Sequence, residues 1–273
     1  MRVGDGLEDN AAFMAFLQAL PTTFDGQGHE VHHARNILKT IDAKGLGLPD
    51  GIESVMVKRY RGLLWFQKLD YTFMRQPKCR RAFDNTAELR RRGFDAAREL
   101  GVVEVWNHGL FQYAFFVSEV AQGKRLDSLV VELQEAGDKN TVSALIGQYA
   151  SLVCSLHEHG VLYWDMNCGN VICRQDQQDG TWHFTLIDTN RAKFFDPNVP
   201  LDLDTVIGDL VLMNPKMGTV EMFQEAYLKK RGLYTPEVAE HVREVQRKRQ
   251  QKKRPMKNFM KRFKKSYYKW LEK

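Results

Sequence analysis

The chain has no long apolar run and no paired cysteines. Its apolar stretches, such as Tyr113 to Val117, fall far short of the roughly 20 residues that a membrane-spanning helix needs. The N-terminus carries Asp5 and Glu8 and has no basic start before an apolar stretch, so we expect no secretory signal. The four cysteines form no Cys-x-x-Cys pair, so neither a zinc site nor a disulfide framework is indicated. These absences favour a cytoplasmic protein with reduced thiols.

The composition is that of an ordinary globular protein, but its charge is unevenly distributed. Hydrophobic residues make up 43% of the 273 residues and charged residues 27%, which is enough for one large domain or two modest lobes. The formal net charge is +6. Residues Val242 to Lys273 hold 14 Lys or Arg against 2 Glu, so this tail is strongly basic and the remaining chain is acidic.

Three polar residues have a spacing that suits phosphoryl transfer. Asp165, Asn170 five residues later and the more distant Asp188 can supply one base and two metal ligands. Phosphoryl transfer depends mainly on holding Mg²⁺, the nucleotide phosphates and an acceptor hydroxyl in line. The spacing alone also occurs by chance, and Asp188 could be a turn residue that follows a strand.

The neighbouring sequence favours the functional interpretation. The pattern from Ser143 to Glu158 predicts an amphipathic helix that ends near Gly160. Val171 to Cys173 predicts a short strand, and a polar turn then leads to a second strand, Trp182 to Ile187, which ends at Asp188. Helix, loop, hairpin and Asp follow one another as in the C-terminal lobe of a kinase.

Upstream, the pattern predicts a small sheet. We expect strands at 29–34, 37–41, 53–60, 102–107 and 112–120, with a basic helix at 77–100 that is interrupted at Gly93. A short helical pattern ends at Pro21 and belongs to an N-terminal extension. The fold class is therefore α+β, with a small antiparallel-sheet N-lobe (1–117), a mostly helical catalytic C-lobe (118–241) and a basic tail (242–273). The hinge is expected near 117–122.

In this layout a basic residue on the third strand should meet the nucleotide phosphates. Lys58 has that position, and Glu88 on the following helix could hold it by an ion pair. In the alternative interpretation Lys58 is one of several basic residues near a strand end, and Glu88 pairs locally with Arg91 or Arg92. Asp84, one helical turn earlier, competes with Glu88 as the acid that holds Lys58.

On these residues the chain resembles the protein-kinase-like superfamily and, within it, the bacterial lipopolysaccharide core kinases that phosphorylate Kdo or heptose. The resemblance extends from about His29 to Asp209. Its most specific segments are Arg35-Asn36, Val57 to Tyr60, Arg80 to Phe94, Asp165 to Asn170 and Leu186 to Arg191. It implies a bilobal protein-kinase-like fold.

The resemblance also implies a role for each candidate residue. Asp165 would be the catalytic base that orients the sugar hydroxyl, while Asn170 and Asp188 would bind Mg²⁺. Lys58 would contact the phosphates of ATP, and Glu88 would fix Lys58.

Two further residues match the pattern. Asp209 could brace the backbone of the catalytic loop, or it could be a plain surface carboxylate. His157 matches the end of the helix before that loop, where a packed histidine is expected rather than a catalyst.

The chain also departs from protein kinases. Tyr163-Trp164 replaces the usual His-Arg before the catalytic Asp, and Asp188 lacks the Phe-Gly that normally follows it, which argues against a phosphorylated activation loop. No Gly-x-Gly-x-x-Gly precedes Lys58, so phosphate binding falls to backbone N–H groups and to Arg35 or Lys39. No Ala-Pro-Glu follows either, so no groove for a peptide substrate is indicated.

The basic tail has the pattern of an interfacial helix. Phe259, Phe263, Tyr267 and Trp270 recur every three or four residues among the basic residues beyond Pro255. Such a helix would bind an anionic membrane surface through residues 242–273. The alternatives are a solvated charge run or an aromatic face packed on the C-lobe. Nucleic acid is disfavoured as a partner because no nucleic-acid-binding module accompanies the run.

The sequence therefore predicts an ATP- and Mg²⁺-dependent kinase of a sugar hydroxyl in the lipopolysaccharide inner core. The expected substrate is a glycolipid, with Kdo of Kdo-lipid A as the acceptor, and the expected location is peripheral, at the cytoplasmic face of the inner membrane. An atypical protein kinase is the alternative enzyme. A membrane-associated pseudokinase is the alternative without catalysis.

Overall fold

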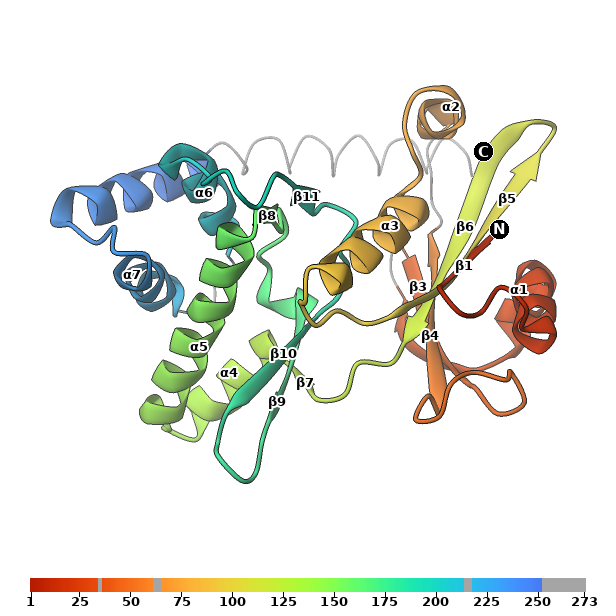
Figure 1. Cartoon of the computed structure of the whole chain (residues 1–273), viewed down its shortest axis with the longest axis horizontal. Helices are drawn as coiled ribbons and strands as arrows, with labels where there is room; N and C mark the ends of the chain where they lie inside the picture. The colour runs from red at the N-terminus through yellow and green to blue at the C-terminus, as the bar shows by residue number, and fades with distance from the viewer. Residues whose placement is uncertain (34–35, 61–64, 214–217, 252–273) are drawn as a thin grey trace, which may run out of the picture. The chain divides into compact units, whose positions relative to one another are not determined.

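The computed structural model describes residues 1–33, 36–60, 65–213 and 218–251, and the chain forms two compact units (Figure 1). The first unit consists of Met1–Leu129 and Gly169–Phe194, and the second of Val130–Cys168 and Phe195–Lys273. Helices and antiparallel sheets occur together, so the α+β expectation is confirmed. The first unit includes the hairpin within Gly169–Phe194, which the sequence analysis placed in the C-lobe, residues 118–241.

A six-stranded antiparallel sheet forms the centre of the first unit. Its spatial order is β1 (Arg2–Val3), β5 (Glu99–Asn107), β6 (Leu110–Glu119), β4 (Ser54–Tyr60), β3 (Asn36–Asp42) and β2 (His29–His33). The five strands that the sequence predicts are confirmed, whereas the two-residue β1 is additional. In β3 and β4 buried and half-buried residues alternate, since successive side chains of a strand point to opposite faces.

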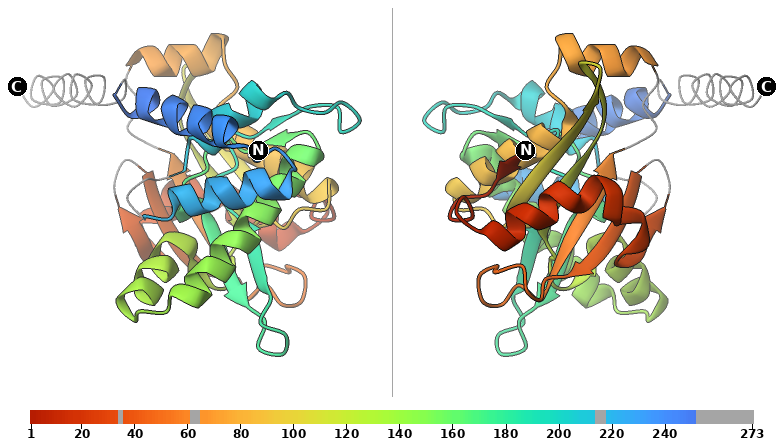
Figure 2. Two further views of the ribbon diagram at one scale, coloured as in Figure 1. Left: turned by 90° about the vertical axis from the view of Figure 1, so that its left-hand side faces the viewer. Right: turned by 90° about the vertical axis from the view of Figure 1, so that its right-hand side faces the viewer.

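Helices cover both faces of this sheet (Figures 1 and 2). Helix α1 (Ala11–Thr23) packs on one face, where Phe13, Leu17 and Leu20 join the buried residues of β3, β4 and β6 in one apolar cluster. Helix α3 (Lys78–Arg91) packs on the other face through Cys79 and Phe83, together with residues that include Tyr71 of α2 (Trp65–Phe73). Lys58 and Tyr60 belong to the face that α3 covers.

Two helix ends differ from the sequence expectation. Helix α1 continues through Pro21 to Thr23, because a proline in the last turn removes only one helical hydrogen bond. The segment expected as an extension thus supplies one wall of the core. Helix α3 ends at Arg91, and Gly93 follows with a left-handed backbone (φ 85°) that glycine adopts without strain. The chain then enters β5, so the helical expectation beyond Gly93 is wrong.

A three-stranded sheet completes the first unit. It has the order β10 (Trp182–Leu186), β9 (Val171–Gln175) and β7 (Lys124–Arg125). The hairpin is also bonded to the segment after α3, because Ala97 N–H donates to Leu186 C=O and Leu186 N–H donates to Asp95 C=O. These long-range bonds explain why the hairpin belongs to the first unit.

The second unit is mostly helical. It contains α5 (Lys139–Glu158), β8 (Val161–Leu162), α6 (Leu203–Leu210), α7 (Val220–Lys230) and helical turns at 236–251, while α4 (Leu126–Glu135) carries the boundary between the units. Helix α5 packs against α7, with the rings of Tyr149 and Phe223 stacked at 5.3 Å. All four cysteines are buried, and none of them forms a disulfide within the described residues. None of the helices in the described ranges has the length and apolar character needed to cross a bilayer.

Candidate active site

The hairpin of β9 and β10 brings two candidate metal ligands to the same end of the first unit. Asn170 directly precedes β9, and Asp188 follows β10 by two residues. The backbone N–H of Ile187 donates to the C=O of Asn170 at 2.9 Å, which ties the two segments together next to both side chains. Asp188 has a left-handed backbone (φ 60°), a conformation that aspartate tolerates better than most residues.

Lys58 on β4 forms an ion pair with Asp188. Its Nζ lies 2.9 Å from Asp188 Oδ1, and Asn190 Nδ2 donates to the same oxygen at 2.6 Å. Both of these contacts are made by Oδ1 rather than Oδ2. Burial alone would raise the pKa of Asp188, but the Lys58 charge and the hydrogen bonds from Lys58 and Asn190 outweigh it and hold the pKa below its ordinary value. The carboxylate is therefore ionised at neutral pH.

Neutral hydrogen bonds attach helix α3 to the segment after Asp188. Asn85 Nδ2 donates to the C=O groups of Thr189 (2.8 Å) and Ala192 (3.2 Å). The buried hydroxyls of Thr86 and Thr189 lie 2.8 Å apart, and each lies within hydrogen-bond distance of the C=O of Ala82, at 2.8 and 3.0 Å. Neutral hydrogen bonds thus hold the backbone next to Asp188 against α3.

The structure does not bring Glu88 to Lys58. Glu88 lies near the end of α3, where it binds Arg91 at 2.7 Å and Arg92 at 2.6 Å. The guanidinium of Arg92 in turn lies over the ring of Phe194 at 5.1 Å. The structure therefore shows the local pairing with arginines of the same helix end, and Glu88 positions Arg92 rather than Lys58.

Asp84 does not take the place of Glu88 either. Its carboxylate accepts hydrogen bonds from Arg2 at 2.7 Å and from Gln76 at 2.6 Å. No acidic residue of α3 contacts Lys58 in the described part of the chain, since the ion pair of that lysine is with Asp188.

Of the two candidates for phosphate binding upstream of Lys58, Lys39 is not part of this group. Lys39 is buried on the face of the sheet that α1 covers, opposite to Lys58. Its Nζ donates to the backbone C=O groups of Phe24, Asp25 and Gln27 at 2.9 to 3.1 Å. Three acceptors satisfy the ammonium group, so it has no donor left for a nucleotide. Arg35 lies outside the described residues.

The candidate base belongs to the second unit. Asp165 is half-buried and directly follows Trp164, whose backbone is left-handed (φ 53°). The carboxylate of Asp209, which is fully buried on α6, accepts hydrogen bonds from the N–H groups of Tyr163 (2.9 Å) and Trp164 (2.8 Å). Asp209 therefore braces the backbone that precedes Asp165, and the alternative of a surface carboxylate is wrong.

A buried histidine connects this brace to α7. His157 Nε2 lies 3.2 Å from Asp209 Oδ2, and His157 Nδ1 lies 2.7 Å from the hydroxyl of Tyr227. Since a carboxylate only accepts, His157 Nε2 is the donor to Asp209. The expectation of a packed histidine is confirmed, and the contacts extend from the segment before Asp165 through α6 and α5 to α7.

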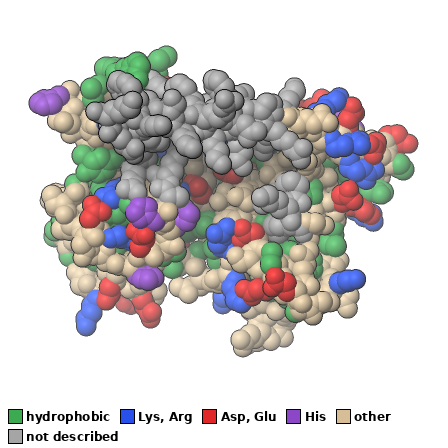
Figure 3. Space-filling view, turned by 180° about the vertical axis from the view of Figure 1, so that it is seen from behind, with side chains coloured by type: hydrophobic (Ala, Val, Ile, Leu, Met, Phe, Trp, Pro, Cys, Tyr) green, Lys and Arg blue, Asp and Glu red, His purple; other side chains and the backbone are tan. Residues whose placement is uncertain are grey.

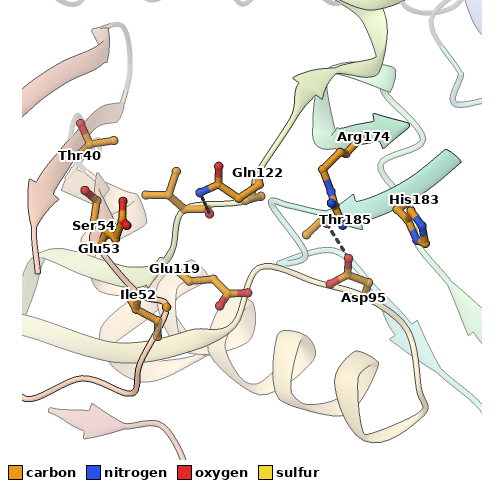
Figure 4. Close-up of a pocket in the computed structure, with 13 residues that line it drawn as sticks. Thr40, Ile52, Glu53, Ser54, Asp95, Glu119, Gln122, Arg174, His183 and Thr185 are labelled. Atoms are coloured by element: carbon orange, nitrogen blue, oxygen red, sulfur yellow. Dashed lines mark hydrogen bonds between the residues drawn. The ribbon is translucent and has the colours of Figure 1, made fainter. Parts of the chain in front are cut away.

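A cavity of about 840 Å³ lies in the first unit at residues 119–122 of the expected hinge (Figure 4). The carboxylates of Asp95 and Glu119 line it, and Asp95 accepts a hydrogen bond from the hydroxyl of Thr185 at 2.6 Å. Among the described residues that line it, neither Lys58 nor Asp188 is present. The cavity is therefore separate from the ion pair.

The sequence profile of the lipopolysaccharide kinase (Kdo/WaaP) family matches residues 42–198, which is more than half of the chain. The chain belongs to this family. A solved structure described as WaaP in complex with acyl carrier protein has a similar fold, with a TM-score of 0.56 and 15% identity over 91% of this chain and 99% of that chain. A comparison with curated proteins gives no significant match.

Membership makes the chain a lipopolysaccharide kinase, which is a phosphotransferase that acts on a sugar hydroxyl and uses ATP. The donor set of the first unit suits Mg²⁺. This cation prefers oxygen ligands and is usually bound by one or two carboxylates together with substrate phosphates. Asp188 and Asn170 supply such oxygens, whereas no group of three or more His, Cys, Asp and Glu side chains forms a metal site elsewhere in the described ranges.

The residues of this lipopolysaccharide kinase that sequence reasoning missed lie on one stripe of α3. Asn85 and Thr86 follow Ala82 by three and four residues, and all three face the segment after Asp188. Thr189 and Asn190 were singled out in the sequence. The helical pattern of residues 77–92, however, does not reveal which distant segment of the backbone each face of the helix contacts.

Replacing Glu88 with glutamine tests the assignment of its partners. We expect kinase activity close to that of the wild type, because Glu88 contacts Arg91 and Arg92 and not Lys58. The free energy of unfolding at pH 7 should fall by about 1 kcal/mol or less, as is usual for exposed ion pairs.

The pH dependence of this effect has a definite sign. Hydrogen bonds from Arg91 lower the pKa of Glu88 from 4.5 to about 2 despite partial burial. A lowered folded pKa stabilises the fold above pH 4.5, and this contribution disappears as the pH falls through about 2. Denaturant titrations of both proteins between pH 7 and pH 2 should therefore converge at the acid end. A large loss of activity in a folded Glu88→Gln protein would contradict the assignment.

Proposed function

We propose that this lipopolysaccharide kinase transfers the terminal phosphate of ATP to a hydroxyl of Kdo in Kdo-lipid A, with Mg²⁺ as cofactor. The observation that carries the proposal is the end of the hairpin, where an ionised Asp188 is paired with Lys58 beside Asn170. A carboxylate, an amide and an ammonium group there match the needs of a metal-bound triphosphate.

Each residue then has a distinct task. Asp188, through the oxygen that Lys58 does not occupy, and Asn170 would hold the metal ion, which neutralises charge on the phosphates. Lys58 would exchange its contact with Asp188 for a contact with a phosphate oxygen. Asp165 would accept the proton of the sugar hydroxyl as that hydroxyl attacks the phosphorus.

The cavity at residues 119–122 is the best candidate for the nucleobase. Its volume of about 840 Å³ falls within the range of about 300–1,000 Å³ that is usual for small-molecule sites. The carboxylates of Asp95 and Glu119 in its wall favour an uncharged base over phosphate groups. The phosphates would therefore lie at Lys58, on the same unit.

We further propose that the basic tail holds the enzyme at the cytoplasmic face of the inner membrane as a peripheral protein. Residues 252–273, with the aromatic residues expected to face the membrane, lie outside the described residues. On the face shown in Figure 3, acidic and basic side chains of the described residues lie beside one another. The support for a membrane contact is therefore the concentration of positive charge in the tail.

Transfer of labelled phosphate tests the acceptor. The purified full chain is incubated with [γ-³²P]ATP, Mg²⁺ and either Kdo-lipid A or lipid A without Kdo, and fragmentation mass spectrometry locates the added phosphate. We expect one phosphate on Kdo and none on lipid A. Phosphate on a heptose-containing core but not on Kdo-lipid A would refute Kdo as the acceptor, while labelling of protein acceptors alone would favour an atypical protein kinase.

The pseudokinase alternative predicts that ATP does not bind in the presence of Mg²⁺. Calorimetric titration decides this, because it needs no acceptor. Binding without transfer to any glycolipid would leave the nucleotide site intact and remove the proposed acceptor.

A further inference from the structure

A tyrosine hydroxyl next to the ion pair lacks a partner. Tyr60, two residues after Lys58 on β4, is only 6% exposed, and its hydroxyl has no hydrogen-bond partner within the part of the chain that the structure describes. The Lys58 Nζ lies over its ring, 5.0 Å from the centroid. A buried polar group without a partner is costly, so such groups are rare unless a ligand or water satisfies them.

A second orphaned donor faces the same region. Arg81 Nε on α3 is buried and also lacks a hydrogen-bond partner among the described residues. Arg81 lies one helical turn before Asn85, which contacts the backbone of Thr189, so this face of α3 is directed at the segment that carries Asp188. The neighbouring Arg80 differs, because Glu104 neutralises it at 2.6 Å.

The two orphaned groups and the ion pair are close enough to influence one another. Burial has the largest effect on the pKa of Tyr60 and raises it, the charge of Asp188 raises it further and the charge of Arg81 lowers it. The hydroxyl therefore keeps its proton and can donate. Lys58 and Asp188 cancel each other's charge, which leaves the positive charge of Arg81 uncompensated by a carboxylate of its own in the described chain.

We propose that Tyr60 and Arg81 bind a phosphate oxygen of the nucleotide and so supply part of what a glycine-rich loop supplies in protein kinases. Both are donors without an acceptor, and a phosphate offers several acceptor oxygens with negative charge. Arginine suits this role because its planar group donates in two directions at once. The proposal rests on the proposed function only in taking a nucleoside triphosphate as a substrate, and it holds for any sugar acceptor.

The substitution Tyr60→Phe tests it with one atom. It removes only the hydroxyl, which has no hydrogen-bond partner among the described residues. The melting temperature of the ligand-free full-length protein should therefore stay the same or rise. Affinity for ATP with Mg²⁺ should fall about tenfold, as expected for a lost hydrogen bond to a charged group. Affinity for AMP should change by less than about twofold, since AMP lacks the outer phosphates.

Tyr113→Phe is the matched control. Tyr113 lies on β6 and packs with the cluster on the opposite, α1-covered face, so its affinity for ATP should equal that of the wild type. Arg81→Gln should lower the affinity for ATP in the same way as Tyr60→Phe. Calorimetric titration with ATP, ADP and AMP, without acceptor, measures all of these values.

The opposing results are distinct. Unchanged affinity for ATP in both variants would refute the proposal, as would equal losses for ATP and AMP. A higher KM for Kdo-lipid A with unchanged ATP affinity would mean that the bound phosphate belongs to the glycolipid, and the nucleotide assignment would be wrong. In each case transfer of phosphate to Kdo-lipid A by the wild-type protein shows separately whether the proposed function stands.

Discussion

Replacing Asp165 with alanine should lower the rate of phosphate transfer by about 10³-fold or more while leaving nucleotide binding intact. Loss of a general base costs about 10²–10⁴-fold in rate. Asp165 follows a left-handed Trp164 that the buried Asp209 holds through two backbone hydrogen bonds, so its position is fixed by residues other than itself. The alanine variant should therefore keep its fold.

The measurements separate chemistry from binding. Single-turnover transfer of labelled phosphate gives the chemical rate, and calorimetry with ATP and Mg²⁺ gives the affinity. Asp165→Asn, which keeps the size of the side chain but is a far weaker base, should be nearly as inactive as the alanine variant. Activity within about tenfold of the wild type in either variant would be incompatible with general-base catalysis by this residue.

Asp209→Ala should be among the most destabilising single changes in the second unit. The carboxylate has no exposed surface and accepts three hydrogen bonds, from the backbone of Tyr163 and Trp164 and from the ring of His157. Removing it leaves buried donors without an acceptor and an unsupported left-handed residue. Together we expect a loss of about 3–5 kcal/mol in the free energy of unfolding.

Thermal denaturation checks this value against a control on the same helix. A loss of that size should lower the melting temperature by about 6 °C or more. Asp204 is also on α6, but its side chain is 89% exposed, so Asp204→Ala should change the melting temperature little. If the melting temperature of Asp209→Ala equalled that of the wild type, the hydrogen bonds of Asp209 would not stabilise the fold.

The strands and the catalytic segment could be predicted because their signals are local. Alternation with a period of two defines β3 and β4, and the spacing of Asp165, Asn170 and Asp188 is written directly in the chain. The sequence also indicated that a basic residue on β4 would be held by an acid of the following helix, Glu88 or Asp84. It was the identity of that acid, Asp188 rather than Glu88, that depended on the tertiary arrangement.

The remaining features depend on contacts between distant parts of the chain. The hairpin joins the first unit through backbone bonds of Leu186 to Asp95 and Ala97, which leave no trace in residue type. Lys39 resembles a phosphate ligand in sequence, but its place on the α1-covered face follows from strand register. Proline at position 21 suggested a helix end because its position within the last turn could not be known in advance.

The neutral hydrogen bonds between α3 and the segment after Asp188 have a consequence for how the enzyme tolerates its surroundings. Dissolved ions screen interactions between exposed charges beyond about 10 Å at 0.1 M ionic strength. They leave neutral contacts, such as those of the buried Thr86 hydroxyl and the half-buried Asn85 amide, almost unaffected. The nucleotide substrate brings counterions with it. The alignment of the helix with Asp188 should therefore persist across wide changes in salt.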